Sequence, residues 1–286
     1  MPVSLQELVD EITPERTVLI FGSGASLPSD APSVKQLISK ISEVFSIDSE
    51  GLTLAEIAGL AERKRNRRDL IQLVQSEFKG VRAKGSILNL PLYNWKSIFS
   101  TNYDELIENS YERAKKPITL FSSNFDFTVH AEPTATKLFK IHGTLSKDVV
   151  DGHSSRMILT DLDYDVTQDF REALYGRLSS DMTSGTQVII IGQSLADPDL
   201  RDLVQKAIAI NQKVSAGGRI ALLLYVPDVN RALLLEARGL KVAFGGLDDF
   251  FFALQKKSSP CIGVSGHRRF FRPFTWFKAC DHLRRC

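Results

Sequence analysis

The sequence predicts an α/β domain with a Rossmann-like parallel sheet, helices on both of its faces and an inserted helical layer. Three observations predict it: short apolar runs recur along the 286 residues, the runs are apolar throughout, and helical stretches separate them. The runs expected to be strands are residues 17–21, 96–101, 138–141, 187–191, 220–225 and 242–244. Helical periodicity over residues 33–78 predicts the inserted layer.

The apolar and helical pattern breaks near residue 257, which we take as the domain end, so that residues 258–286 form a tail or a truncated linker. Residues 261–268 look like the first strand and phosphate turn of a second nucleotide fold that nothing later completes. All three cysteines, Cys261, Cys280 and Cys286, lie in this tail, and none belongs to a C-x-x-C pair. This spacing argues against a disulfide framework and against a structural metal site in the main body.

Composition excludes several classes of partner. Lys and Arg number 36 against 34 Asp and Glu, so a net charge of +2 creates no global field for nucleic acid or an anionic membrane. The basic run at residues 63–68 is expected to be a solvated helix end rather than a phosphate contact. Neither a transmembrane stretch nor a signal-peptide pattern occurs, which predicts a cytoplasmic protein.

A glycine-rich turn follows the first strand. Its sequence, GSGAS at residues 22–26, either holds a phosphate or merely reverses the chain, and it lacks the third glycine of the dinucleotide fingerprint. If it holds a phosphate, we expect the backbone amides of Gly24, Ala25 and Ser26 to do so. Amides at a helix start lack partners within the helix, and the helix dipole favours anions.

Polar residues also follow three later strands. Asn102 comes after the second run and could be a helix N-cap, with Asp104 in the first turn of that helix. His142 follows the third run and could be an ordinary strand-end histidine. Ser194 and Asp197 follow the fourth run and could simply cap the helix that Pro198 begins. All lie past the carboxyl ends of strands, where open α/β sheets bind ligands.

Taken in order, four motifs resemble those of the sirtuin superfamily over residues 5–257. They are GSGAS, STNYDELI, KIHGTL and IIIGQSLADPDLR. The chain lacks the paired C-x-x-C motifs of the deacylase zinc module and carries residues 158–164, ILTDLDY, between the HG and GQS motifs. It is therefore similar to the divergent, zinc-free bacterial branch, whose members act as NAD-cleaving effector domains in anti-phage defence.

The resemblance implies that the chain binds NAD as a substrate, with no metal, and breaks its nicotinamide glycosidic bond. Asn102 and His142 match the essential pair of the family: Asn102 would hold the ribose or orient water, and His142 would be the general base. Tyr164 either covers the site or packs on the sheet. The residues expected to bind NAD are Gly22, Gly24, Ala25, Ser26, Thr101, Asp104, Gly192 and Ser194.

The hypothesis is therefore an NAD+ glycohydrolase that releases nicotinamide and ADP-ribose and depletes NAD in an abortive-infection system. A protein deacylase, a non-enzymatic NAD or ADP-ribose-binding module and a Rossmann oxidoreductase are the alternatives. The absent C-x-x-C pairs count against a deacylase, and the retention of Asn102 and His142 counts against a module that only binds. The missing third glycine counts against an oxidoreductase. We expect a homo-oligomer that is regulated by a further domain or a partner protein.

Overall fold

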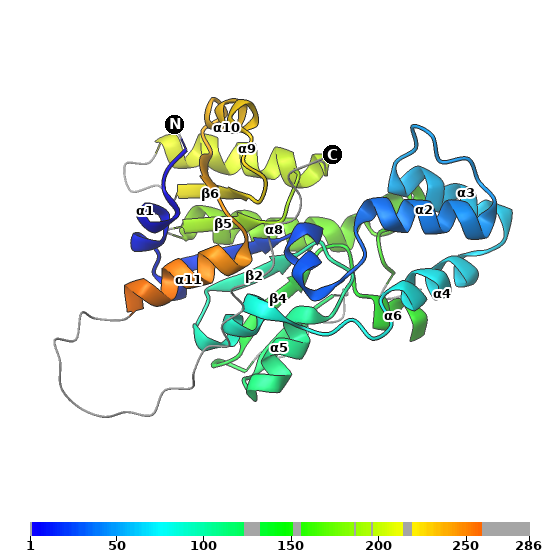
Figure 1. The fold of residues 1–286 in the computed structure, drawn as a ribbon, viewed down its shortest axis with the longest axis horizontal. Helices are drawn as coiled ribbons and strands as arrows, with labels where there is room; N and C mark the ends of the chain where they lie inside the picture. The colour runs from blue at the N-terminus through cyan, green and yellow to red at the C-terminus, as the bar shows by residue number, and fades with distance from the viewer. Residues whose placement is uncertain are drawn as a thin grey trace, which may run out of the picture.

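A computed structural model describes residues 2–122, 132–150, 156–185, 187–195, 197–213 and 219–258. The predicted nucleotide-fold fragment and the three cysteines of the tail lie outside these residues. The core is a seven-stranded, all-parallel sheet in the order β3-β4-β2-β1-β5-β6-β7, which confirms the predicted fold class (Figure 1). Its strands are β1 (Thr17–Phe21), β2 (Ser97–Ser100), β3 (Ile118–Phe121), β4 (Thr136–Lys140), β5 (Gln187–Ile191), β6 (Arg219–Leu224) and β7 (Lys241–Phe244).

Strand β3 is the element that the pattern of apolar runs missed. It is only four residues long, it pairs with β4 alone at the edge of the sheet, and three of its residues are half-buried. An edge strand of this kind carries a weak hydrophobic signal because only part of each face is covered. The other six strands fall within one or two residues of their predicted ranges.

Helices cover both faces of the sheet, and alternate residues of each strand face opposite layers. In β1, Leu19 and Phe21 pack on one layer, whereas Val18 and Ile20 pack on the other. The first layer contains α1 (Leu5–Asp10), the 3-10 helix η4 (Gly85–Leu92), α5 (Leu106–Ala114) and α11 (Leu247–Ser258). The second layer contains α8 (Gln168–Ser184), α9 (Pro198–Lys213) and α10 (Val229–Glu236).

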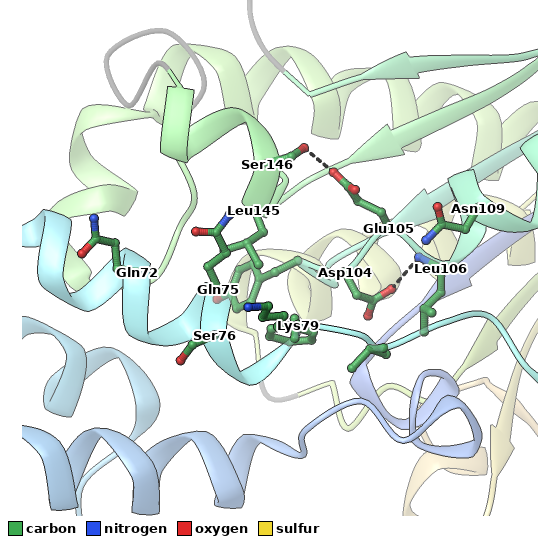
Figure 2. A pocket seen from close by; sticks show the side chains of 13 residues that line it. Gln72, Gln75, Ser76, Lys79, Asp104, Glu105, Leu106, Asn109, Leu145 and Ser146 are labelled. Atoms are coloured by element: carbon green, nitrogen blue, oxygen red, sulfur yellow. Dashed lines mark hydrogen bonds between the residues drawn. The ribbon is translucent and has the colours of Figure 1, made fainter.

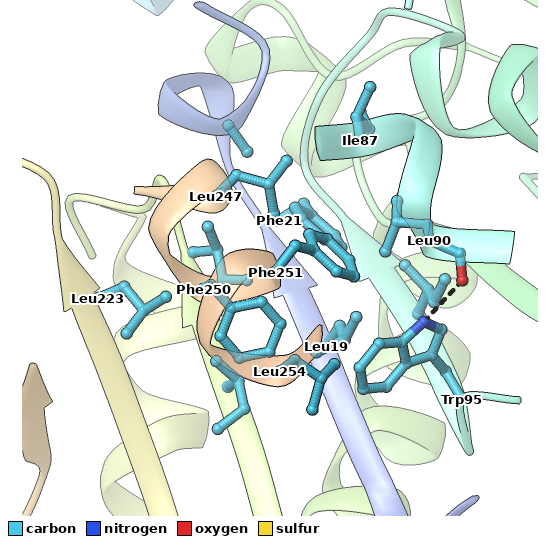
Figure 3. Packing of buried hydrophobic residues seen from close by; sticks show 14 of the residues in the cluster. Leu19, Phe21, Ile87, Leu90, Trp95, Leu223, Leu247, Phe250, Phe251 and Leu254 are labelled. Atoms are coloured by element: carbon cyan, nitrogen blue, oxygen red, sulfur yellow. Dashed lines mark hydrogen bonds between the residues drawn. The ribbon is translucent and has the colours of Figure 1, made fainter. Parts of the chain in front are cut away.

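The first layer has an aromatic centre, drawn in Figure 3. Trp95 lies edge-on to Phe251 with ring centroids 6.4 Å apart, and its indole nitrogen donates to the carbonyl oxygen of Leu90 at 3.0 Å. Phe250 and Phe251 of α11 are fully buried against this ring and the sheet. The last described helix is therefore an integral part of the core, and its apolar face closes the sheet from one side.

A third core lies beyond the sheet, where α2 (Val34–Phe45), α3 (Leu54–Lys64) and α4 (Arg67–Glu77) form the predicted helical layer (Figure 1). Ser33 and Thr53 start α2 and α3 with capping boxes, which satisfy the first unpaired amides. The layer packs against α6 (Leu145–Val150) and α7 (Asp161–Val166). In the part of the chain that the structure describes, no helix combines the length and apolar character needed to cross a membrane.

One residue of the basic run does not behave as expected. Arg67 points inward, with 15% of its side chain exposed, and donates to both carboxylate oxygens of Asp163 and to Asp148. Asp163 is fully buried and also accepts from Arg156. The prediction of a solvated helix end is therefore wrong for Arg67, which instead joins the helical layer to α6 and α7.

Charge compensation keeps Asp163 ionised inside the protein. Burial alone would raise the pKa of its carboxyl group. The positive charge of Arg67, the hydrogen bond from Arg156 and two backbone amides outweigh burial and lower that pKa below its ordinary value of 3.8. The stability contributed by the ionised form is thus fully present above that ordinary value and is lost as the pH falls through the lower folded pKa.

Replacing Arg67 should destabilise the fold because it leaves buried Asp148 without its cation and Asp163 with Arg156 alone. We expect Arg67→Met to reduce the free energy of unfolding at pH 7 by about 3 kcal/mol, measured by urea denaturation. Arg68→Met, at an exposed position of the same helix, is the matched control and should change it by less than about 0.5 kcal/mol. The difference in the free energy of unfolding between Arg67→Met and the wild type should shrink toward pH 3. A difference that does not change with pH would show that ionised Asp163 is not its cause.

Candidate active site

Four neighbouring strands bring the predicted motifs to one edge of the sheet. The order β4-β2-β1-β5 places the turns that contain His142, Asn102, Gly24 and Gly192 side by side. The strands are also in register: Phe21 pairs with Ser100 and with Ile191, and Ser100 pairs with Lys140. Asn102 and His142 therefore each stand two residues beyond a paired position, at the same level above the sheet.

A cavity of about 850 Å³ opens at this edge, between the sheet and the helical layer. Six of the predicted site residues line it, and they are Ser26, Thr101, Asn102, Asp104, His142 and Ser194. The remaining four, Gly22, Gly24, Ala25 and Gly192, are in the turns that support it. The opposite wall is apolar and comes from α2 and α3, mainly through Leu37, Ile38 and Leu54.

The turn after β1 packs directly on the turn after β5. The amide of Gly24 donates to the carbonyl oxygen of Gly192 at 3.0 Å, and Gly192 has a positive φ of 70°. A Cβ added to Gly192 would lie 2.2 Å from the backbone nitrogen of Ala25. Glycine is therefore required at this point, both for the backbone conformation and for the close approach of the two turns.

The expected phosphate cradle of three unpaired amides is wrong. Residues 23–25 and 27–29 form two short 3-10 turns, and the next α-helix starts only at Val34. The amides of Ala25 and Ser26 consequently donate to carbonyls three residues earlier, and the amide of Gly24 donates to Gly192. A role for this turn in binding NAD stays a prediction, carried now by the side chains of Ser23 and Ser26, which line the cavity.

Asn102 lies on the cavity floor, with 8% of the residue exposed. Its Nδ2 donates to the carbonyl oxygen of Gly22 at 3.0 Å and to Ser26 Oγ at 2.9 Å, and Ser26 Oγ donates to Asp104 Oδ2 at 2.7 Å. These bonds fix the orientation of the carboxamide. Its Oδ1 is buried and has no hydrogen-bond partner. Because buried polar atoms are normally paired, this oxygen marks a place where a ligand or water is expected.

His142 contacts a carboxylate that the sequence motifs did not assign to it. Its Nε2 lies 2.8 Å from Asp197 Oδ2, and both side chains are about nine-tenths buried. Asp197 Oδ1 accepts from the amide of Leu200 at 2.9 Å, so the predicted helix cap is present as well. Tyr164 donates to Asp197 Oδ2 at 3.3 Å, which places its ring in the cavity wall beside His142.

Asp104 precedes its helix instead of lying in the first turn. Helix α5 begins at Leu106, whose amide donates to Asp104 Oδ1 at 3.2 Å, and Glu105 is the N-cap residue. Beneath this loop the fully buried Lys140 donates to the carbonyl oxygen of Asp104 and lies 3.6 Å from Glu108 Oε1. Burial raises the pKa of Glu108, although Lys140 opposes this.

Two polar residues of this site were not predicted as functional. Gln193 donates to Thr101 Oγ1 at 2.6 Å and to the carbonyl oxygen of Phe21 at 3.2 Å, so it joins the ends of three strands. Its place inside the GQS motif was the available signal. Asp197 also lies within the longer motif IIIGQSLADPDLR, but its local role as a helix cap already explained an aspartate before a proline.

A second cavity of about 560 Å³ lies behind this loop, between α4, α5 and α6 (Figure 2). Phe78, Tyr103 and Asp104 line both cavities, so these three residues form the wall between them. Figure 2 shows Ser146 bonded to Glu105 at its rim. Across the described residues, no group of three or more His, Cys, Asp or Glu side chains is arranged to hold a metal ion.

Substituting Gly192 should disturb both turns at once. We expect Gly192→Ala to lower the free energy of unfolding by about 2–4 kcal/mol, because the new Cβ collides with backbone and the φ is unfavourable. Gly176→Ala is the matched control, since an added Cβ in α8 meets no atom within 4 Å, and should be neutral or stabilising by up to about 1 kcal/mol. Equal urea midpoints for the two variants would contradict the packing described here.

Comparison with solved structures returns Sir2 enzymes. A structure from work on the mechanism and regulation of Sir2 enzymes has a TM-score of 0.49 at 12% identity, and covers 89% of this chain and 97% of its own. A second, from work on sirtuin substrate affinity, has a TM-score of 0.39 at 15% identity, and covers 87% of this chain and 95% of its own.

Comparison with curated proteins returns the NAD(+) hydrolase ThsA of Cytobacillus dafuensis. It is 24% identical over 209 residues, which are 71% of this chain and 40% of the relative. The chain thus spans about two fifths of the length of this curated relative. Residues 96–243, which contain β2 to β6, most of β7 and both Asn102 and His142, match the profile of the SIR2-like domain. Because this profile covers just over half of the 286 residues, the chain belongs to the SIR2-like domain family.

Proposed function

We propose that this chain is an NAD+ glycohydrolase that cleaves the bond between nicotinamide and ribose with water, giving nicotinamide and ADP-ribose. One observation supports it most strongly: Asn102, whose Oδ1 is buried and unpaired, lines the same cavity as His142, which is paired with a carboxylate. The matched relative is named an NAD(+) hydrolase, which agrees with the proposal. The roles of Asn102, His142 and the other predicted site residues are part of the proposal.

Cleavage of the nicotinamide–ribose bond by water requires stabilisation of positive charge on the ribose and an oriented water molecule. The pyridinium leaving group is already positively charged and needs no acid. As the bond breaks, the ribose acquires oxocarbenium character, which oxygen dipoles and carboxylates stabilise. Asn102 Oδ1 is an acceptor held in a fixed orientation, so it suits either the water or a ribose hydroxyl.

The charged lining of the cavity supports the same reaction. Among the described residues that line it, the acids are five aspartates, and neither a lysine nor an arginine contributes. These aspartates are Asp104, Asp161, Asp165, Asp197 and Asp199. Asp199 is paired with Arg171, which lies outside the lining. The other carboxylates can stabilise the positive charge that moves from the pyridinium ring to the ribose as the bond breaks.

The choice of water over an acyl-lysine acceptor rests on the sequence. The cysteine pairs of the deacylase zinc module are absent from residues 1–257, which we propose as the catalytic domain. Action as an NAD-depleting effector of anti-phage defence, homo-oligomer formation and control by a further domain or partner are further parts of the proposal. Each follows from the resemblance to bacterial sirtuin-like effectors.

The test is incubation of the purified chain with NAD+ alone, with nicotinamide and ADP-ribose followed by chromatography. We expect Asn102→Ala and His142→Ala each to lower kcat/KM by about 100-fold or more, because a positioned acceptor and a general base are lost. Asn109→Ala removes an exposed carboxamide from α5 and serves as the control; its rate should equal that of the wild type.

Binding measurements distinguish a variant that has lost catalysis from one that no longer binds NAD+. Calorimetry with NAD+ should show that both active-site variants still bind it, since most of the cavity is unchanged. Full turnover by Asn102→Ala and His142→Ala would refute the assigned roles. Turnover that requires an acetylated peptide would instead identify a deacylase.

A further inference from the structure

We propose that Asp197 is a positioning residue that holds His142 in the tautomer with hydrogen on Nε2, so that Nδ1 is the atom that accepts the proton. The tautomer is a property of the free protein and can be tested without substrate. Its use in cleaving NAD+ rests on the proposed function. The sequence motifs account for Asp197 only as a helix cap, and the assignment adds a second task to it.

The contact itself defines the direction of the hydrogen bond. His142 Nε2 and Asp197 Oδ2 lie 2.8 Å apart, with 12% and 9% of the two side chains exposed. An ionised carboxylate has no hydrogen to donate, so a hydrogen bond at this distance requires Nε2 to carry one. In a neutral imidazole the other nitrogen, Nδ1, then holds the free electron pair.

The surroundings of Asp197 keep it ionised. Burial alone would raise the pKa of its carboxyl group, but the hydrogen bond from His142, together with those from the Leu200 amide and the Tyr164 hydroxyl, lowers it below the ordinary value. The carboxylate also lies at the N-terminus of α9, a helix of 16 residues whose dipole favours a negative charge. Asp197 is therefore an acceptor near neutral pH.

Helix capping does not account for this geometry. Oδ1 performs the cap by accepting from the Leu200 amide at 2.9 Å. Oδ2 is not part of that bond. It accepts hydrogen bonds from His142 Nε2 and from the Tyr164 hydroxyl, which belong to two other segments of the chain. The two oxygens thus have separate partners, and substitution can remove one function while leaving the other.

The assignment gives a balanced proton path for the proposed reaction. A water oxygen forms a bond to the anomeric carbon while the bond from that carbon to the pyridinium nitrogen breaks, and its electron pair leaves with nicotinamide. The proton of the water passes to His142 Nδ1. The resulting imidazolium stays beside the Asp197 carboxylate until Nδ1 releases the proton to solvent, so the net products are nicotinamide, ADP-ribose and one proton.

The first test reads the tautomer directly. Two-bond ¹⁵N–¹H correlation spectra of the protein without NAD+ distinguish protonated from unprotonated ring nitrogens, and they are recorded at the high-pH end of the titration, where the ring signals no longer change. We expect the His142 Nε2 to be protonated in the wild type. In Asp197→Asn the side-chain amide can donate as well as accept, so a mixture of tautomers should appear. His142→Ala assigns the signals.

The second test separates positioning from capping. Serine is as good a helix cap as aspartate but is too short to reach His142, so Asp197→Ser should keep the thermal midpoint within a few degrees of the wild type. We expect its kcat for NAD+ to fall by about 100-fold with KM changed by less than about threefold, because only the base is affected. Asp202→Asn, an exposed residue of the same helix, is the charge-matched control and should behave as the wild type.

The outcomes can be told apart. A wild-type His142 protonated on Nδ1, or an Asp197→Ser variant with unchanged tautomer and unchanged kcat, would overturn the inference. If the wild type binds NAD+ without cleaving it, the proposed function fails, and the spectra still decide the tautomer.

Discussion

Parallel pairing of β4, β2, β1 and β5 in register is the constraint on which the rest of this molecule depends. Each strand leaves the sheet at the same level, so four short turns from distant parts of the chain must share one small volume. That crowding dictates glycine where the turns after β1 and β5 meet, and it forces Asn102 to hydrogen-bond across to Gly22 and Ser26. Backbone geometry thus brings the residues of the site together, and the hydrogen bonds of Asn102 then fix the orientation of its carboxamide.

Several side chains of the site connect different segments of the chain through hydrogen bonds. Ser26, Asp104 and Asp197 each take part in more than one hydrogen bond or bridge two segments, and Lys140 holds the Asp104 loop from below. Asn102 alone among them keeps a buried oxygen without a partner. An unpaired buried acceptor costs folding free energy on the order of 1–3 kcal/mol, and such costs are typical of residues whose partner is a ligand.

The fold and most of the candidate site could be predicted because their signals are local. Apolar runs predict the strands, and glycine or polar residues directly after them predict the turns. Pairings between distant residues could not be predicted: Asp197 lies 55 residues from His142, and Arg67 lies 81 and 96 residues from Asp148 and Asp163. In both cases a local explanation, a helix cap or a solvated basic run, was already sufficient. The prediction of unpaired amides after β1 was wrong for a related reason, because only the structure shows that the chain forms 3-10 turns there.

In the proposed reaction, the five aspartates that line the cavity would also act after the bond is broken. In the proposed reaction NAD+ enters with two negative phosphates and one positive pyridinium, whereas nicotinamide departs neutral and the remaining ADP-ribose has lost its only positive charge. An acidic wall repels this product more strongly than it repels the substrate. Under the proposed function, the carboxylates that would favour the transition state would also favour release of ADP-ribose, which would protect turnover from inhibition by this anionic product.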